Sequence, residues 1–244
     1  MSFATELFIK RAKDECAWHI KRSDYIKTRQ VIESIKRQTC DFWPQAYNQV
    51  TDDWRSLICC WGSLMTKTSK DGEVLYMFKD LVAAGGLLAK DPGSHNVYAK
   101  ALSKKHPDKA IKYLLDYMRP GELLASQDSS HNTLAAIYNQ EHLHQKAIDH
   151  ILLLIEEGGV LEENKIAYIE LGIAFNASGQ PQGTVKYLGP NLRDGKFLCN
   201  CEKADSLYQE ALDLFGLSQL AVEESRPEQA LNGLRHTPQY IPQT

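Results

Sequence analysis

The 244-residue sequence predicts an all-α protein: a right-handed superhelical solenoid of about six antiparallel helix hairpins. Three observations predict this fold. A small residue recurs at a nearly constant interval, prolines stand at a fixed distance before several of these residues, and apolar residues follow helical spacing. No segment shows the period-two alternation of a half-buried strand, so we expect no sheet.

The recurring small residue defines the second helix of each expected hairpin. Residues 168–188 align with residues 131–151 without gaps, at an offset of 37 residues. Extending that register in both directions gives a series in which most intervals are 36 or 37 residues and two are 46. The series consists of Thr28, Val74, Ala110, Ala147, Thr184 and Ala230.

Prolines support the same register. Pro107, Pro181 and Pro227 each lie three residues before a small residue of the series. Proline is favoured in the first turn of a helix, where its missing N–H has no intrahelical partner to lose. Each second helix is therefore expected to begin near this position.

Glycine inside a first helix needs a reason, because it costs about 1 kcal/mol relative to alanine. Gly172 and Ala135 occupy equivalent places on two such helices. Each is expected to face the small residue of the following helix, Thr184 or Ala147, so that the two backbones approach closely.

The repeat pattern indicates one domain over 1–238, with the best-matching repeats at 91–192 and a C-terminal tail at 239–244. The segments 39–56 and 189–203 interrupt the register and are interpreted as insertions.

Pro190 is expected to end the preceding helix near Leu188, because proline removes a helical hydrogen bond. Phe197 and Leu198 are expected to anchor the rest of 189–203 on the body of the protein.

Composition argues against several partner classes. A net charge of −3 gives no global reason to expect nucleic acid. No apolar stretch is long enough to span a membrane, and the N-terminus lacks the apolar segment of a secretion signal. With six cysteines and no metal-binding spacing, we expect a cytoplasmic protein with reduced thiols and no metal. Nucleotide-binding and catalytic motifs are absent, so we expect no cofactor and no enzymatic activity.

Two successive repeats carry a common motif: a Leu followed by Gly or Ala, an aromatic residue four positions after the Leu, and a small residue on the next helix. The motif is formed by Tyr168, Leu171, Gly172, Phe175 and Gly179, and in the preceding repeat by Leu134, Ala135, Tyr138, Ala147 and Ile151. It resembles the tetratricopeptide repeat family. The period of 36–37 residues is longer than the family's, and Thr184 stands where the family has alanine, so related helical-hairpin families remain open.

This resemblance implies that first-helix residues line a concave groove, which binds an extended peptide or a helix of another protein. Asn139 and Asn176 occupy equivalent positions, and an amide can both donate to and accept from a peptide backbone. The alternative is that both are ordinary polar residues at the end of a helix. Carried over by position, the groove residues are His95, Ala99, Asn132, Ala136, Asn139, Gln140, Ile173 and Asn176.

These features favour a protein–protein interaction module, acting as a scaffold or adaptor. A regulator that senses a signalling peptide is the alternative. An enzyme with a site inside the helical array is a third reading. An open groove favours the module, whereas a deep closed pocket with perturbed titratable groups favours the enzyme.

Overall fold

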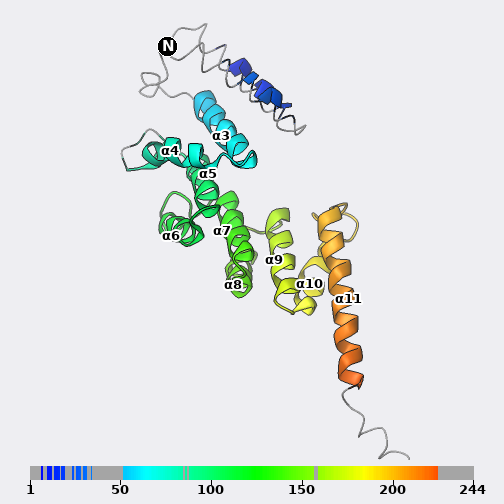
Figure 1. Cartoon of the computed structure of the whole chain (residues 1–244). Coiled ribbons are helices and arrows are strands. Elements are labelled where there is room, and N and C mark those ends of the chain that lie inside the picture. Colours follow the sequence, from blue (N-terminus) through cyan, green and yellow to red (C-terminus); the bar gives the residue numbers. More distant parts are fainter. Residues whose placement is uncertain are drawn as a thin grey trace, which may run out of the picture. The chain divides into compact units, whose positions relative to one another are not determined.

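The computed structural model describes residues 52–84, 86, 88–156 and 159–224, together with separate positions between Leu7 and Ser34. Throughout this part of the chain the regular elements are helices and no strand occurs, which confirms the all-α prediction (Figure 1). The chain divides into two compact units, Met1–Glu141 and His142–Thr244. The expected tail 239–244 lies outside the described residues.

Helices of the first unit form antiparallel neighbours in chain order. Helices α3 and α4 both pack against α5, while α5 and α6 both pack against α7. Their bounds are α3 (Asp52–Lys67), α4 (Asp71–Val82), α5 (Pro92–Ser103), α6 (Pro107–Tyr117) and α7 (Asp128–Gln140).

The second unit repeats this arrangement. Helix α9 packs against α8 and α10, and α11 packs against both α9 and α10. The bounds are α8 (His144–Leu154), α9 (Lys165–Ala177), α10 (Pro181–Leu188), the 3-10 helix η2 (Gly189–Asn191) and α11 (Glu202–Glu224).

Helix starts follow local chemistry. Pro107 and Pro181 are the first residues of α6 and α10, as the sequence predicts. Asp91 caps α5 by accepting a hydrogen bond from the Ser94 N–H at 2.7 Å. Pro227 lies outside the described residues.

The recurring small residues that the structure describes lie in the interior. Each of the five that the structure describes is fully buried, which confirms the repeat register for the second helices. Ala230 lies outside the described residues. The five are Thr28, Val74, Ala110, Ala147 and Thr184.

Close helix approach at Gly172 is confirmed. The Thr184 hydroxyl oxygen lies 3.2 Å from the Gly172 carbonyl oxygen, and a Cβ on Gly172 would lie 3.1 Å from Leu188 Cδ2. The equivalent glycine of α3 is more crowded. A Cβ on Gly62 would lie 2.5 Å from Val97 Cγ1 and 2.7 Å from Phe78 Cζ.

A second repeated feature lies in the connections between the described hairpins. In the four connections that lie between α4 and α11, within the described residues, a buried leucine donates its backbone N–H to the carbonyl seven residues earlier, at 2.8–3.1 Å. Its carbonyl accepts from the N–H three residues later. The four leucines are Leu88, Leu124, Leu161 and Leu198, at intervals of 36, 37 and 37 residues.

A glycine precedes each of these leucines by three residues. Gly121 and Gly195 have φ values of +86° and +79°, in the left-handed region that favours glycine. The other two, Gly85 and Gly158, lie outside the described residues. The left-handed turn directs the chain back toward the core, where the leucine inserts.

The segment 189–203 is therefore not an insertion, and that prediction is wrong. It contains the same connection as 83–91, 118–127 and 155–164, and the 3-10 turn of η2 takes the place of the last turn of the preceding helix. Two expectations about it are confirmed. Helix α10 ends at Leu188, and Leu198 and Phe197 pack into the core of the second unit, with the Phe197 ring 4.8 Å from that of Tyr168.

Candidate functional site: a groove on the first unit

A groove of about 680 Å³ runs across α3, α5 and α7. These are the first helices of three successive hairpins, so the groove lies on the type of helix that the sequence analysis expects to bind a partner. Its walls are formed by Ser63, Thr66, Lys67, Ser69, Asp71, Val97, Lys100, Ser103, Lys104, Thr133, Ala136, Ile137 and Gln140.

Most of these residues occupy equivalent positions in the repeat. The series Ser63, Lys100 and Ala136 takes one residue from each of the three helices. The series Lys67, Lys104 and Gln140 takes the last residue of α3, the residue that follows α5 and the last residue of α7. The groove is thus a product of the repeat itself: the same face of each first helix is presented once per hairpin.

The groove carries an excess of positive charge. Its walls contain three lysines, Lys67, Lys100 and Lys104, and one carboxylate, Asp71. Lys100 retains solvent contact, yet burial of its ammonium lowers its pKa, and the nearby charge of Lys67 lowers it further. Two ammonium groups therefore repel each other across the groove.

Two of the predicted groove residues lie there. Ala136 is half-buried and Gln140 is exposed, and both line the groove from α7. Asn132 and Asn139, on the same helix, are buried. Partner binding by any of them stays a prediction.

His95 and Ala99 lie in the interior and do not line the groove. Both are fully buried. The His95 Nε2 donates to the Ala89 carbonyl at 3.0 Å, and its Nδ1 accepts from the Tyr113 hydroxyl at 2.6 Å. Because a carbonyl can only accept, this pair fixes the neutral tautomer, and burial lowers the pKa of the ring.

A one-residue shift in register explains this placement. Helices α5 and α7 begin 36 residues apart, at Pro92 and Asp128. The second helices, α6 and α8, begin 37 residues apart because α7, with 13 residues, is one residue longer than α5. His131 shows the correct equivalence: its Nε2 lies 3.0 Å from the Ala125 carbonyl, repeating the contact of His95 with Ala89. Counting 36 residues back from Ala136 gives Lys100, which lines the groove.

The two predicted residues of the second unit lie on α9. Ile173 is half-buried. Asn176 donates to the Leu207 carbonyl at 3.0 Å and to Glu210 Oε2 at 3.3 Å, and its Oδ1 accepts from the Thr184 hydroxyl at 2.6 Å. Its amide therefore joins three helices of this unit, α9, α10 and α11, and its binding of a partner stays a prediction.

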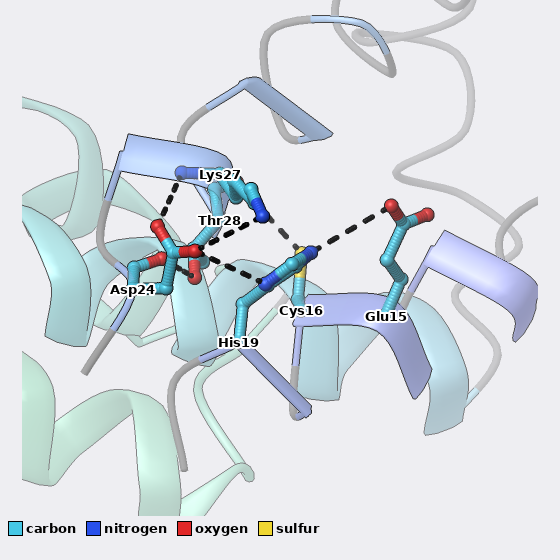
Figure 2. A network of polar contacts seen from close by, with 6 residues as sticks. All are labelled: Glu15, Cys16, His19, Asp24, Lys27 and Thr28. Carbon is cyan, nitrogen blue, oxygen red and sulfur yellow. Dashed lines mark hydrogen bonds and ion pairs between the residues drawn. The ribbon is translucent and has the colours of Figure 1, made fainter. Parts of the chain in front are cut away.

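A separate polar cluster lies near the N-terminus. Figure 2 shows the His19 ring between two carboxylates, with Nε2 3.8 Å from Glu15 and Nδ1 3.7 Å from Asp24. Asp24 also accepts from the Lys27 N–H at 3.2 Å, which is the geometry of a helix N-cap. The cluster thus joins the helical residues around His19 to the start of the next helical segment.

Cys16 completes this cluster without supplying a nucleophile. Its thiol donates to the Thr28 carbonyl at 4.0 Å, and burial raises its pKa to about 12. A thiol with that pKa stays protonated near neutral pH, whereas the thiolate is the reactive form. The contact therefore contributes to packing.

The described residues were also considered as metal ligands and as membrane spans, and neither arrangement occurs among them. Within the described part of the chain, no three His, Cys, Asp or Glu side chains gather as a metal site would require. None of the helices described is both long and apolar enough to cross a bilayer. The five cysteines that the structure describes are free thiols.

Comparison with known proteins returns no relative. No family model matches this chain, and neither a curated protein nor a solved structure is significantly similar to it.

Sequence reasoning missed Lys67, Lys100 and Lys104. The repeated leucine of the connections predicts them, because Leu88 and Leu124 are 36 residues apart and each directly precedes a first helix. Aligning the first helices at this offset places Lys100 opposite Ala136 and Lys104 opposite Gln140. The small residues Ala110 and Ala147, 37 residues apart, report only on the second helices.

Proposed function

We propose that this protein is an interaction module, a scaffold or adaptor, whose groove on α3, α5 and α7 binds a segment of another protein. The observation that supports it is the construction of the groove from equivalent positions of three successive helices. A surface of this kind extends along the stack and suits an elongated occupant, either an extended chain or a helix.

The proposal includes the wider architecture that the sequence predicts: a right-handed superhelix of about six hairpins acting in the cytoplasm, by binding and without catalysis. The repeated connections around Leu88, Leu124, Leu161 and Leu198 support a stack of like units.

Side chains on α7 support occupancy of the groove. Ala136 is small and leaves space, while the exposed Gln140 can donate to and accept from a peptide backbone. A polar backbone group buried without a partner costs about 1–3 kcal/mol, so an amide in the wall favours binding of a peptide.

A display selection with random peptides tests the proposal. Peptides selected on the unmodified protein should lose at least tenfold in affinity, about 1.4 kcal/mol, toward Ala136→Trp, because the indole fills the groove. Leu115→Trp is the matched control, since Leu115 is exposed on α6 and does not line the groove. It should bind as the unmodified protein does.

Unchanged affinity for Ala136→Trp would place the selected peptides elsewhere and contradict the proposal. Circular dichroism on both variants establishes that each retains its helices.

A further inference from the structure

We propose that a second groove of the first unit, between α4, α5 and α6, binds a phosphotyrosine side chain of a partner protein. This tyrosine groove is a separate site, because none of its lining residues lines the groove on α3, α5 and α7. Its volume of about 390 Å³ is in the range of about 300–1,000 Å³ that is usual for ligand pockets. Its walls include Lys79, Tyr98, Lys109, Lys112, Tyr113 and Tyr117.

Aromatic rings form one wall of the tyrosine groove. The ring centroids of Tyr98 and Tyr113 are 5.2 Å apart, and those of Tyr113 and Tyr117 are 4.9 Å apart. At these separations tilted and edge-to-face aromatic pairs attract one another. The ring of a ligand can join this cluster through the same kind of contact.

Hydrogen bonds hold this wall in place from behind. The Tyr113 hydroxyl donates to His95 Nδ1 at 2.6 Å, and His95 Nε2 donates to the Ala89 carbonyl at 3.0 Å. The His95 ring also lies 4.6 Å from the Tyr117 ring. Because the wall is already ordered, little side-chain entropy is lost when a ligand packs against it.

The repeat itself does not require these tyrosines. Equivalent residues of the next hairpin are 36 positions later on the first helix and 37 later on the second. They are Leu134 for Tyr98, His150 for Tyr113 and Leu154 for Tyr117. A like hairpin therefore packs without three aromatic rings at these positions, which favours a role in binding for the tyrosines.

The tyrosine groove also carries positive charge. Lys79 of α4 and Lys109 and Lys112 of α6 are exposed and line it. Among the residues that the structure describes, none of these three ammonium groups forms an ion pair. Asp116 is the single carboxylate in the walls, and it is already paired with Arg119. The net charge of the walls therefore complements an anion.

Hydrogen-bond donors in the tyrosine groove favour a phosphate. An ammonium group donates and cannot accept. Burial raises the pKa of Tyr98, so its hydroxyl stays protonated and can donate as well. A phosphate ester has three acceptor oxygens and a charge of about −1.5 to −2 near pH 7. It therefore matches three cations better than a carboxylate does.

Phosphotyrosine combines the two properties that the tyrosine groove selects, an aromatic ring and a phosphate at its far end. Phosphoserine has the phosphate without the ring. A free nucleotide has both a ring and a phosphate, but its base and ribose also carry hydrogen-bond donors, and the walls offer these one carboxylate that is already paired. Phosphotyrosine is therefore the best match.

The experiment is a fluorescence-anisotropy titration of the full chain with a short labelled peptide, acetylated and amidated at its ends, with phosphotyrosine between glycines and serines. The same peptide with tyrosine or phosphoserine at that position is the control. We expect the phosphotyrosine peptide to bind at least about tenfold more tightly than either control, a difference of about 1.4 kcal/mol, and more weakly as salt is added. Adenosine monophosphate should displace it less well than phenyl phosphate does.

Variants of the lysines locate the phosphate. Lys109→Gln with Lys112→Gln should weaken binding of the phosphotyrosine peptide at least about tenfold, and Lys79→Gln, on a different helix, should weaken it independently. Lys146→Gln is the matched control and should leave binding unchanged. Lys146 is exposed on α8 at the position equivalent to Lys109, outside the tyrosine groove.

A variant of the wall locates the ring. Tyr98→Leu introduces the residue that the next hairpin has at this position, Leu134, which is buried there. The variant should lose most of the preference for phosphotyrosine over phosphoserine while still binding the phosphate. Circular dichroism on every variant establishes that the helices are retained.

Equal binding of the phosphotyrosine and tyrosine peptides overturns the proposal, and so does an equal loss in Lys146→Gln and in the double lysine variant. Equal binding of phosphotyrosine and phosphoserine, or an unchanged preference in Tyr98→Leu, overturns recognition of the ring. Stronger displacement by adenosine monophosphate than by phenyl phosphate assigns the site to a nucleotide and overturns the assignment to phosphotyrosine. None of these outcomes touches the groove on α3, α5 and α7, which Ala136→Trp tests separately.

Discussion

Gly62 provides the sharpest test of how closely the helices of the first unit pack. It lies inside α3, where alanine would normally be preferred to glycine by about 1 kcal/mol. A methyl group there would meet Val97 Cγ1 at 2.5 Å and the Phe78 ring at 2.7 and 2.9 Å. Both of these side chains are buried, so neither can move aside without disturbing the core.

Gly72 is a matched control in the same unit. It lies in the first turn of α4, and a methyl group there would meet only Lys105 Nζ, at 3.2 Å, the free end of a flexible side chain. Gly62→Ala and Gly72→Ala thus introduce the same atoms into helices and gain similar helix propensity. They differ in the crowding that the new methyl group meets.

The difference between the two free energies of unfolding therefore measures that crowding. Adding one methyl to a well-packed core costs typically about 1–3 kcal/mol, so Gly62→Ala should be less stable than Gly72→Ala by this amount. Urea unfolding followed by far-UV circular dichroism measures it. Equal midpoints, or a more stable Gly62→Ala, would refute the close approach of α3 to α4 and α5.

Three further predictions concern single side chains. Asn176→Ala should lower the free energy of unfolding by about 1–3 kcal/mol, because it removes the hydrogen bonds to the Leu207 carbonyl and from the Thr184 hydroxyl, each worth about 0.5–1.5 kcal/mol; a change of a few tenths in urea unfolding would contradict this role. Cys59, whose pKa burial raises to about 12, should resist iodoacetamide near neutral pH in the native protein and react in denaturant; mass spectrometry would show rapid native labelling if this is wrong. Burial lowers the pKa of His95 in the folded protein. As the pH falls, this histidine is therefore protonated in the unfolded chain, near pH 6.5, before it is protonated in the folded chain. The free energy of unfolding should then decrease as the pH drops from about 6.5 toward the pKa of the folded state. His95→Gln should lose that part of the pH dependence, and urea midpoints with the same pH dependence in both proteins would contradict the assignment.

Helix type and the start of several helices could be predicted because they depend on local chemistry. Proline fixes the first turn of α6 and α10 whatever surrounds it. The small residues could also be predicted, since close packing of two helices requires them wherever the backbones meet.

The register of the first helices could not be taken from the same series. The one-residue difference in length between α5 and α7 moves every predicted groove position on α5 by one residue, or about 100° around a helix with 3.6 residues per turn. That shift replaced Lys100 with the buried Ala99 and removed the positive charge from the predicted groove.

The segment 189–203 was misread for a different reason. Its proline and two cysteines obscure a pattern carried by only two residues, Gly195 and Leu198. The two residues are recognised as part of the repeat only in the structure, where the Leu198 N–H donates to the Asn191 carbonyl as the equivalent leucines do in three other described connections.

Mapping amide chemical-shift changes along the chain, during titration with a display-selected peptide, tests the central claim most directly. If equivalent faces of three successive helices form the binding groove, the largest changes should fall on 63–67, 97–104 and 133–140. Changes centred on α4 and α6, with those three stretches unmoved, would contradict it.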